Sequence, residues 1–322
     1  MKIRIFNGLK LFISSLMFIT LLNGCKLDTI QVGVSVYPVQ YLVERIAQSK
    51  VQVHLMSQGE TITRASLIDD YQTTINNLDV FFDLGQLESY MITHLETFNE
   101  AKVKIIDLVS TAGVYKFQRY TTSIVENQVF TVESPYYNSS AFDSVDMYMA
   151  DPYLWLDPIT MTSMANTIKN WLCDSYPEEK LFFEENFETL EFELANMDAN
   201  YQALWNKDNI KMVTITPSFG NWQKAYGLSI YPVILSRYGA LPNADQLKEI
   251  ELKILQDNVT YIVKEPFMSA DMLALFDTIK TDLNLTEIAL DNISFLSEKN
   301  ISDNKNYITL MYENLAILQS LE

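Results

Sequence analysis

Short apolar runs along the chain alternate with segments in which apolar residues recur at helical spacing. The run "IQVGVSVYP" (residues 30–38) predicts a buried strand that ends at Pro38, and residues 39–46 then place their apolar side chains on one helical face. Further strands are expected at residues 51–56, 78–85, 101–108, 210–216, 228–235, 259–266 and 285–291, and further helices at residues 67–78, 90–98, 222–226, 243–256, 269–282 and 306–321. This alternation predicts an α/β fold built from parallel sheets flanked by helices.

One long helix is expected near the middle of the chain. Its apolar stripe keeps spacings of three and four without interruption through Phe183, Phe187, Leu190, Leu194, Met197, Tyr201 and Leu204. Pro177 lies where such a helix would begin, and a helix from Phe183 to Leu204 would be about 32 Å long. A coiled-coil dimer could use the same stripe, but Tyr and Met in the seam favour packing against the chain's own lobes.

The pattern as a whole predicts two α/β lobes joined by this helix, with a ligand cleft between the lobes. We expect an N-terminal lobe at residues 25–175, the linking helix at residues 176–207 and a C-terminal lobe at residues 208–322. Residues 108–150 interrupt the alternation with a tyrosine-rich stretch, in which "SIVENQVFTVES" could close a small hairpin.

The N-terminus has the features of an export signal. Lys2, Arg4 and Lys10 precede an apolar run at residues 11–22, which is shorter than the roughly 20 residues that span a membrane. The "LNGC" ending resembles a bacterial lipobox, which implies cleavage of residues 1–24 and a lipid on Cys25; an uncleaved anchor is the alternative. Either would tether a folded domain outside the cytoplasmic membrane.

Charge excludes one class of partner. The chain of 322 residues has 41 acidic and 23 basic residues, a formal net charge of −18, and nucleic acids select basic surfaces. We therefore expect no nucleic-acid partner.

Several motifs, in order, resemble the zinc and manganese solute-binding lipoproteins of ABC importers. The block "DPYLWLDP" (residues 151–158) matches that family's "DPHVWLDP" in six of eight positions. Similar matches are "DVFFDLG" to "DLFIYNG", "SFGNWQKAYGL" to "AFGYLAKRYGL" and "VKEP" to "FFEP", and "NYITLMYENL" matches the family's closing helix. The resemblance covers nearly the whole mature chain.

The resemblance implies one metal ion between the lobes, usually held by three histidines and a carboxylate. Carried over position by position, these ligands fall on Thr63, Tyr153, Thr216 and Asp291. Only Asp291 is of the ligand type, because a threonine hydroxyl is a weak donor and a phenol of pKa about 10 must first lose its proton. The metal site is therefore expected to be degenerate or altered.

Other candidate residues do not restore a zinc site. His54 and His94 lie outside the family's ligand positions and are interpreted as structural or solvated. Glu265 ends a strand that faces the expected cleft, where it either binds ligand or bonds to loop amides. With Tyr153 and Asp291 it would offer oxygen donors of the kind that manganese or iron(III) prefers over zinc.

These observations favour an extracytoplasmic solute-binding lipoprotein with an ABC permease and an ATPase as partners, monomeric and with no certain cofactor. A metal ion, zinc, manganese or Fe(III), is its expected cargo if the site still binds one. The alternative is a metal-free surface lipoprotein that binds a protein partner or an organic, siderophore-like ligand in the same cleft. An enzyme is not expected, because no Ser-His-Asp set, phosphate-binding loop or CxxC motif is present.

Overall fold

The structure is a computed structural model that describes residues 29–59, 61–117, 120–125, 128–133, 137–207 and 210–321. Residues 1–30 and residues 31–322 form two separate units, because most contacts lie within each of them. The fold described next is that of residues 31–322. The expected signal peptide (residues 1–24) and Cys25 lie outside the described residues.

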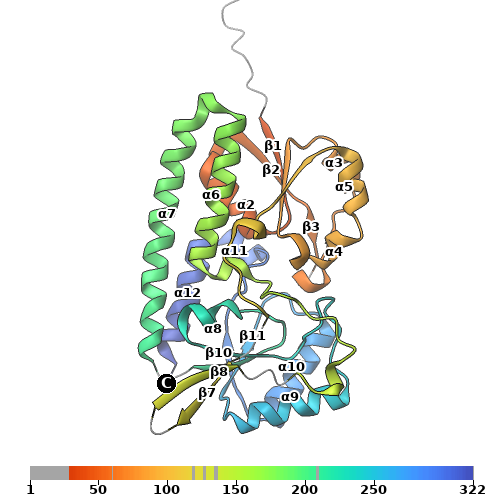
Figure 1. Ribbon diagram of the computed structural model, residues 1–322, viewed down its shortest axis with the longest axis vertical. Coiled ribbons are helices and arrows are strands. Elements are labelled where there is room, and N and C mark those ends of the chain that lie inside the picture. Colours follow the sequence, from red (N-terminus) through yellow and green to blue (C-terminus); the bar gives the residue numbers. More distant parts are fainter. Residues whose placement is uncertain are drawn as a thin grey trace, which may run out of the picture. The chain divides into compact units, whose positions relative to one another are not determined.

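The N-terminal lobe is built on a four-stranded sheet in the order β2-β1-β5-β6. Strand β5 pairs in parallel with both β1 and β6. The strands and helices of this lobe are β1 (Ile30–Val34), α2 (Tyr37–Ala47), β2 (Val51–Leu55), α3 (Tyr71–Ile75), β5 (Val80–Asp83), α4 (Ser89–Ile92), α5 (Leu95–Ala101) and β6 (Lys104–Asp107) (Figure 1). The residues of β5 are all buried, as expected for a central strand.

The C-terminal lobe repeats this plan with a parallel sheet in the order β10-β9-β11-β12. Its elements are β9 (Lys211–Thr214), α8 (Asn221–Tyr226), β10 (Ser229–Pro232), α9 (Ala244–Gln256), β11 (Tyr261–Lys264), α10 (Ala270–Asp282), β12 (Thr286–Ala289), α11 (Glu298–Ser302) and α12 (Tyr307–Ser320). The two parallel sheets flanked by helices have the architecture that the sequence predicted.

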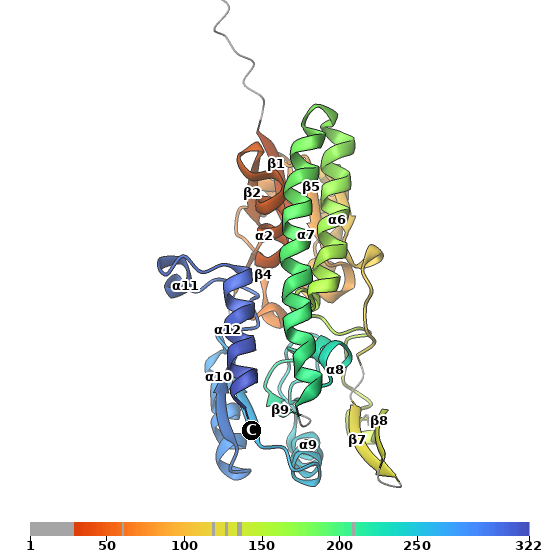
Figure 2. The same cartoon turned by 90° about the vertical axis from the view of Figure 1, so that its left-hand side faces the viewer.

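The expected long helix is α7 (Lys180–Gln202), which follows α6 (Pro158–Ser175) and packs on α2 and α6 of the N-terminal lobe and on α8 of the C-terminal lobe (Figure 2). Every member of the predicted apolar stripe is buried. The stripe therefore faces the chain's own elements.

Helix α6 begins at a capped and buried position within "DPYLWLDP". The carboxylate of Asp157 accepts hydrogen bonds from the backbone N of Ile159, at 2.9 Å, and from Oγ1 of Thr160, at 3.0 Å. Pro158 follows as the first helical residue. The motif thus fixes the chain at the start of α6.

The tyrosine-rich stretch contains the expected hairpin, formed by β7 (Tyr120–Val125) and β8 (Gln128–Glu133). Near it, the rings of Tyr137 and Tyr148 pack against Phe117, with centroids 6.0 and 6.1 Å away. Both tyrosines are buried, so neither presents a free ring to solvent.

Two predicted helices were wrong in their extent. The helix expected at residues 90–98 is divided into α4, which ends at Ile92, and α5, which begins at Leu95. The helix expected at residues 67–78 is only α3 (Tyr71–Ile75), because Leu67 belongs to the short strand β4 (Ser66–Leu67). Leu67 is buried opposite Ser57 of β3 (Ser57–Gln58) in an antiparallel pair. Burial of Leu67 in this pair outweighs the local helical spacing.

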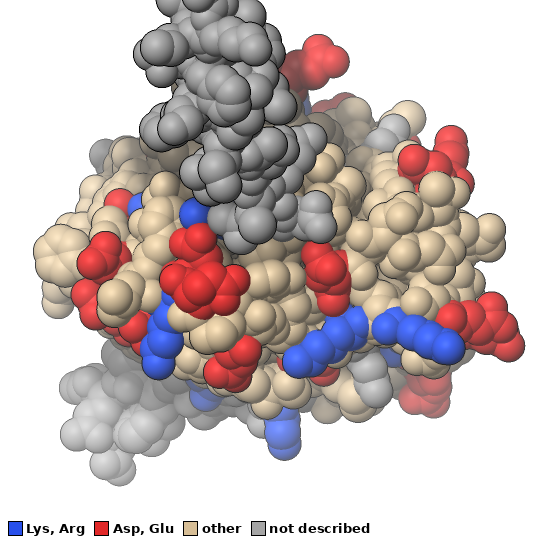
Figure 3. Space-filling model, turned by 90° about the horizontal axis from the view of Figure 1, so that it is seen from above, with Lys and Arg blue, Asp and Glu red and all other residues tan. Residues whose placement is uncertain are grey.

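Among the described residues, no helix combines the length and the apolar content that a membrane span needs. The face in Figure 3 carries single Lys and Arg side chains interspersed with Asp and Glu. That face offers no continuous basic surface.

The apolar stripe of α7 gives a matched test of its packing. Leu194 is 0% exposed and Leu181, in the same helix, is 75% exposed. Leu194→Ala should lower the free energy of unfolding by about 2–5 kcal/mol, whereas Leu181→Ala should change it by less than about 0.5 kcal/mol. Urea denaturation of both variants measures the difference, and equal losses would show that the stripe does not face a packed interior.

Candidate functional site

A buried polar cluster lies where the strands of the C-terminal sheet end. Glu265 directly follows β11, Thr216 and Ser218 follow β9, and Asn292 follows β12. Because parallel strands bring their carboxyl ends to one edge of the sheet, residues from three separate segments meet there. We call Tyr153, Thr216, Ser218, Glu265 and Asn292 the Glu265 cluster.

Glu265 is the centre of this cluster and is only 4% exposed. Its Oε2 accepts hydrogen bonds from Oγ1 of Thr216 at 2.8 Å, from Nδ2 of Asn292 at 2.9 Å and from Oγ of Ser218. Its Oε1 accepts from the backbone N of Thr216 at 3.3 Å. Four donors thus surround one carboxylate, as a buried charge requires.

Tyr153 enters the cluster from the segment that precedes α6. Its hydroxyl donates to Oγ1 of Thr216 over 3.4 Å, and its ring centroid lies 5.2 Å from that of Trp155. Nδ2 of Asn221 donates to the carbonyl of Tyr153 at 3.0 Å and fixes the backbone. The side chain is fully buried, so Tyr153 fills space at the junction of the lobes.

Burial controls the protonation of both acidic groups. Burial, and next the nearby Glu265, raises the pKa of Tyr153 far above its ordinary value, so the phenol keeps its proton at neutral pH. Burial also raises the pKa of Glu265, and hydrogen bonds from Ser218, Asn292 and Thr216 oppose that rise. The cluster therefore offers a metal ion one carboxylate that is already bonded and a neutral phenol.

Thr63 lies in a short turn, Ile62–Arg64, and is buried. Its hydroxyl is 3.2 Å from that of Thr61. The next residue, Arg64, donates from Nε and Nη2 to the carbonyl of Gly239 at 3.0 and 2.7 Å and forms an ion pair with Asp271 at 2.9 Å. This turn therefore ties the N-terminal lobe to the C-terminal lobe.

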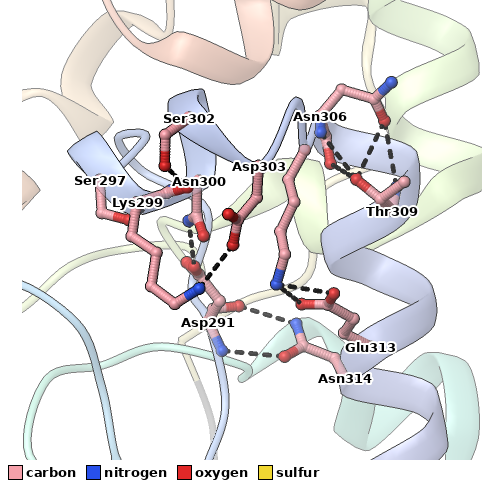
Figure 4. Close-up of polar contacts among 11 residues, drawn as sticks. Asp291, Ser297, Lys299, Asn300, Ser302, Asp303, Asn306, Thr309, Glu313 and Asn314 are labelled. Atoms are coloured by element: carbon pink, nitrogen blue, oxygen red, sulfur yellow. Dashed lines mark hydrogen bonds and ion pairs between the residues drawn. The ribbon is translucent and has the colours of Figure 1, made fainter.

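Asp291 faces α11 and α12 (Figure 4). Its Oδ1 accepts from the backbone N of Ile293 at 2.8 Å and its Oδ2 from Nδ2 of Asn300 at 3.2 Å. Its own backbone N and carbonyl are both bonded to the amide of Asn314, each at 2.8 Å. Through these hydrogen bonds, Asp291 fixes the loop between β12 and α11.

Of the sequence-predicted positions, the structure brings Tyr153, Thr216 and Glu265 together. The side chains of Thr63 and Asp291 bond elsewhere, to Thr61 and to Ile293 and Asn300. The sequence analysis missed Ser218 and Asn292. Both closely follow a predicted parallel strand, and this placement could have indicated that they lie at the same sheet edge as Glu265.

A pair of buried carboxyl groups, Asp83 and Glu88, lies at the corresponding edge of the N-terminal sheet. Glu88 is 1% exposed; its Oε2 accepts from the backbone N of Leu84 at 2.9 Å and its Oε1 from the hydroxyl of Tyr90 at 3.2 Å. Asp83, at the end of β5, is 5% exposed, and its Oδ1 accepts no hydrogen bond. Each lobe thus buries a glutamate at its sheet edge.

Metal-binding residue types do not converge in the part of the chain that the structure describes. No group of three or more His, Cys, Asp or Glu side chains there could hold a metal ion. Nε2 of His54 is hydrogen-bonded to Oε1 of Gln31 at 2.8 Å, and the His94 ring packs against Tyr71 with centroids 5.0 Å apart. These contacts of His54 and His94 do not involve the Glu265 cluster.

Comparison with known proteins shows that the sequence matches one family over nearly all of the described residues. The sequence profile described as "ZnuA: Zinc-uptake complex component A periplasmic" matches residues 32–321. The zinc-binding lipoprotein AdcA of Streptococcus pneumoniae is 26% identical over 170 residues, which are 52% of this chain and 33% of the relative. The alignment thus spans about a third of that relative's length.

Solved structures share the fold at low sequence identity. The Zn(II)-bound ZnuA-like domain of Streptococcus pneumoniae AdcA has a TM-score of 0.66 and 21% identity, over 91% of this chain and 99% of that one. A mutant of the laminin-binding adhesin Lmb of Streptococcus agalactiae has a TM-score of 0.71 and 18% identity, over 91% and 100%. Both relatives support the two-lobed architecture.

The buried carboxyl pair of the N-terminal lobe predicts an unusual pH dependence. Burial, and then repulsion by Asp107, raises the pKa of Asp83 to about 7. Burial, and then repulsion by Asp83, raises the pKa of Glu88 to about 8. Because the folded chain holds these protons after the unfolded chain has lost them, the free energy of unfolding should fall as pH rises from about 4.5 to about 8.

Glu88→Gln should flatten this decline, measured by urea denaturation across the same pH range. The exposed residue Glu100 of α5 provides the control, since Glu100→Gln should leave the slope as it is in the wild-type chain. A wild-type stability that rises over this range would contradict the assignment.

Proposed function

We propose that this chain, which belongs to the ZnuA family of periplasmic zinc-uptake components, is the extracytoplasmic solute-binding lipoprotein of an ABC importer whose metal site is altered. The observation that carries the proposal is the Glu265 cluster, in which hydroxyl and amide groups take the place of histidines. The family consists of transport components and not of enzymes, and the sequence-based prediction that the chain is not an enzyme agrees with this.

The chemistry of the cluster argues against zinc bound in the usual way of the family. Zn²⁺ favours neutral imidazole nitrogen and carboxylate donors in a tetrahedral set. Here the phenol of Tyr153 keeps its proton, and the hydroxyl of Thr216 donates to Glu265. A zinc ion would have to displace these bonds and would gain weak ligands in return.

A harder cargo ion is a narrower form of the same proposal. Oxygen donors suit manganese or Fe(III) better than zinc, and the Glu265 cluster consists of oxygen donors and one amide. Binding would require the phenol of Tyr153 to lose its proton and Oε2 of Glu265 to exchange its donors for the ion. Asp291 would contribute only if it left Asn300.

The chain's cellular location, its partners and its oligomeric state follow from the same proposal. A lipid on Cys25 would anchor the chain to the outer face of the bacterial cell membrane, beside an ABC permease with its ATPase. The family match and the formal net charge of −18 both support a partner other than nucleic acid. The apolar stripe of α7 is already buried against other elements of the same chain and is not exposed for a second copy, which supports a monomer.

The second candidate is a metal-free surface lipoprotein that binds a protein partner or an organic ligand. It is favoured by the lack of any three metal-binding side chains in one place among the described residues. A siderophore-like ligand stacked on free tyrosines is less well supported, because Tyr137 and Tyr148 are buried.

Zinc titration of the full-length chain tests the altered site. By calorimetry, the wild-type chain should bind Zn²⁺ more weakly than about 1 μM. The double substitution Tyr153→His and Thr216→His should create binding at or below that value, because the side chains at these positions converge beside Glu265, with the Tyr153 hydroxyl 3.4 Å from Oγ1 of Thr216.

Three comparisons sharpen this titration. Asp291→Ala in the double variant should leave zinc binding in place, since Asp291 is engaged by Ile293 and Asn300. Wild-type binding of Zn²⁺ below 1 μM that Asp291→Ala removes would contradict the altered site. Binding of Mn²⁺ or Fe³⁺ by the wild-type chain that Glu265→Gln removes would support the harder ion.

Transport is tested with the ABC permease and ATPase of the same organism. Reconstituted in liposomes, that complex should hydrolyse ATP several-fold faster when the full-length chain is added, because a solute-binding component signals through the permease. An unchanged rate with a folded chain would favour the metal-free surface lipoprotein.

The anchor is tested in the producing cells with the same chain. Cys25→Ala should move the protein from the membrane fraction to the medium or periplasm. Membrane retention equal to that of the wild-type chain would count against lipidation.

A further inference from the structure

A pocket of about 380 Å³ lies beside the buried tyrosines and takes its walls from both lobes. Leu87 and Asp107 come from the N-terminal lobe, Lys116 and Tyr148 from the tyrosine-rich stretch, and Arg237 from the C-terminal lobe. A volume of this size lies in the lower part of the range for small organic ligands. We call it the Arg237 pocket.

Arg237 is the residue of this pocket with unused hydrogen-bonding capacity. Its side chain is only 14% exposed, and its buried Nε makes no hydrogen bond. The one carboxylate near it, that of Asp146, is 58% exposed and lies 3.9 Å from Nε. A buried donor without an acceptor costs about 1–3 kcal/mol, so an anionic ligand that accepted from Nε would recover that energy.

Hydrogen bonds fix the backbone of Arg237, and its guanidinium lies over the ring of Tyr238, with Cζ 5.2 Å from the ring centroid. The carbonyl of Arg237 accepts a hydrogen bond from Oγ of Ser89 at 2.8 Å and another from the hydroxyl of Tyr148 at 3.2 Å. Its backbone N donates to the carbonyl of Asp146 at 2.9 Å. A fixed backbone reduces the part of Arg237 that a ligand would have to order.

The charges of the pocket favour one negative group. Lys116 and Arg237 are two cations, and Asp107 is the only acid among the lining residues. Oδ1 of Asp107 already accepts from the backbone N of Val109 at 2.8 Å. Within the lining the cations therefore outnumber the acids by one, and outside it Asp146 forms a long, 58% exposed ion pair with Arg237 at 3.9 Å, which solvent screens.

The rest of the lining is mostly apolar. Leu87, Val109 and Ala150 line the pocket together with two exposed residues, Val114 at 39% and Met149 at 74%. Exposed apolar side chains next to a concave surface are typical of ligand-binding sites. They suit the hydrocarbon part of a ligand whose charged end is held by Arg237.

We propose that the Arg237 pocket binds a small organic acid, with its carboxylate on Arg237 and Lys116 and its apolar body against Leu87, Val109 and Val114. This acid is the solute that the chain presents to the importer. That role rests on the proposed function, whereas binding of the acid does not.

Three probes of one shape test the charge preference. Phenylpropionate, phenylpropanol and phenylpropylamine share an apolar body and carry an anionic, a neutral or a cationic end. Calorimetry on the full-length chain in detergent should show phenylpropionate binding at least about tenfold more tightly than either of the others. Equal or tighter binding of the alcohol or the amine overturns the proposal, and so does failure of the folded wild-type chain to bind phenylpropionate.

Two substitutions locate the site. Arg237→Gln should weaken phenylpropionate binding at least about tenfold, and Val114→Trp should do the same by filling the pocket. Arg45→Gln is the matched control and should leave binding unchanged, because the Arg45 guanidinium already pairs with Glu193 at 2.8 Å. If Arg237→Gln does not fold, the exposed position Val114 decides the question, and binding that survives Val114→Trp overturns the proposal.

The two proposals fail in different ways. Loss of phenylpropionate binding with intact stimulation of the importer's ATPase would sink the organic-acid site alone. Binding of phenylpropionate without any such stimulation would sink the importer function and leave the pocket standing.

Discussion

The carboxyl end of the C-terminal sheet is organised around the carboxylate of Glu265, which is buried and must stay hydrogen-bonded. A buried carboxylate without donors is costly, and here three side chains and one backbone N surround it. Thr216, where the resemblance implies a metal-binding histidine, supplies two of these donors. Three of the four bonds fall on Oε2, so a metal ion at that oxygen would have to displace at least one of these donors.

Contacts between the lobes run largely through backbone carbonyls. Arg64 bonds to the carbonyl of Gly239, Ser89 to that of Arg237, and Nε1 of Trp155 to that of Asn292 at 2.7 Å. Such bonds depend on where the loops lie more than on which side chains they carry. The walls of the Arg237 pocket belong to both lobes, so any shift of one lobe against the other would change the shape of that pocket.

Periodicity along the sequence predicted the strands, the long helix and its buried stripe, because these features follow from local spacing. The helix at residues 67–78 was wrong in extent because Leu67 pairs with a strand ten residues away, which local spacing does not reveal. The ligand positions were harder still. Asp291 and Asn292 are adjacent, but only Asn292 bonds to Glu265, whereas the carboxylate of Asp291 accepts from Ile293 and from Asn300 of α11.

The last helix of the chain completes the lobe that is made first. The backbone N of Tyr307, at the start of α12, donates to the hydroxyl of Tyr37 in α2 at 3.1 Å, and the hydroxyl of Tyr307 donates to the carbonyl of Trp155 at 2.6 Å. During synthesis on the ribosome, the N-terminal lobe must therefore wait for nearly the whole chain before this part of its surface is covered.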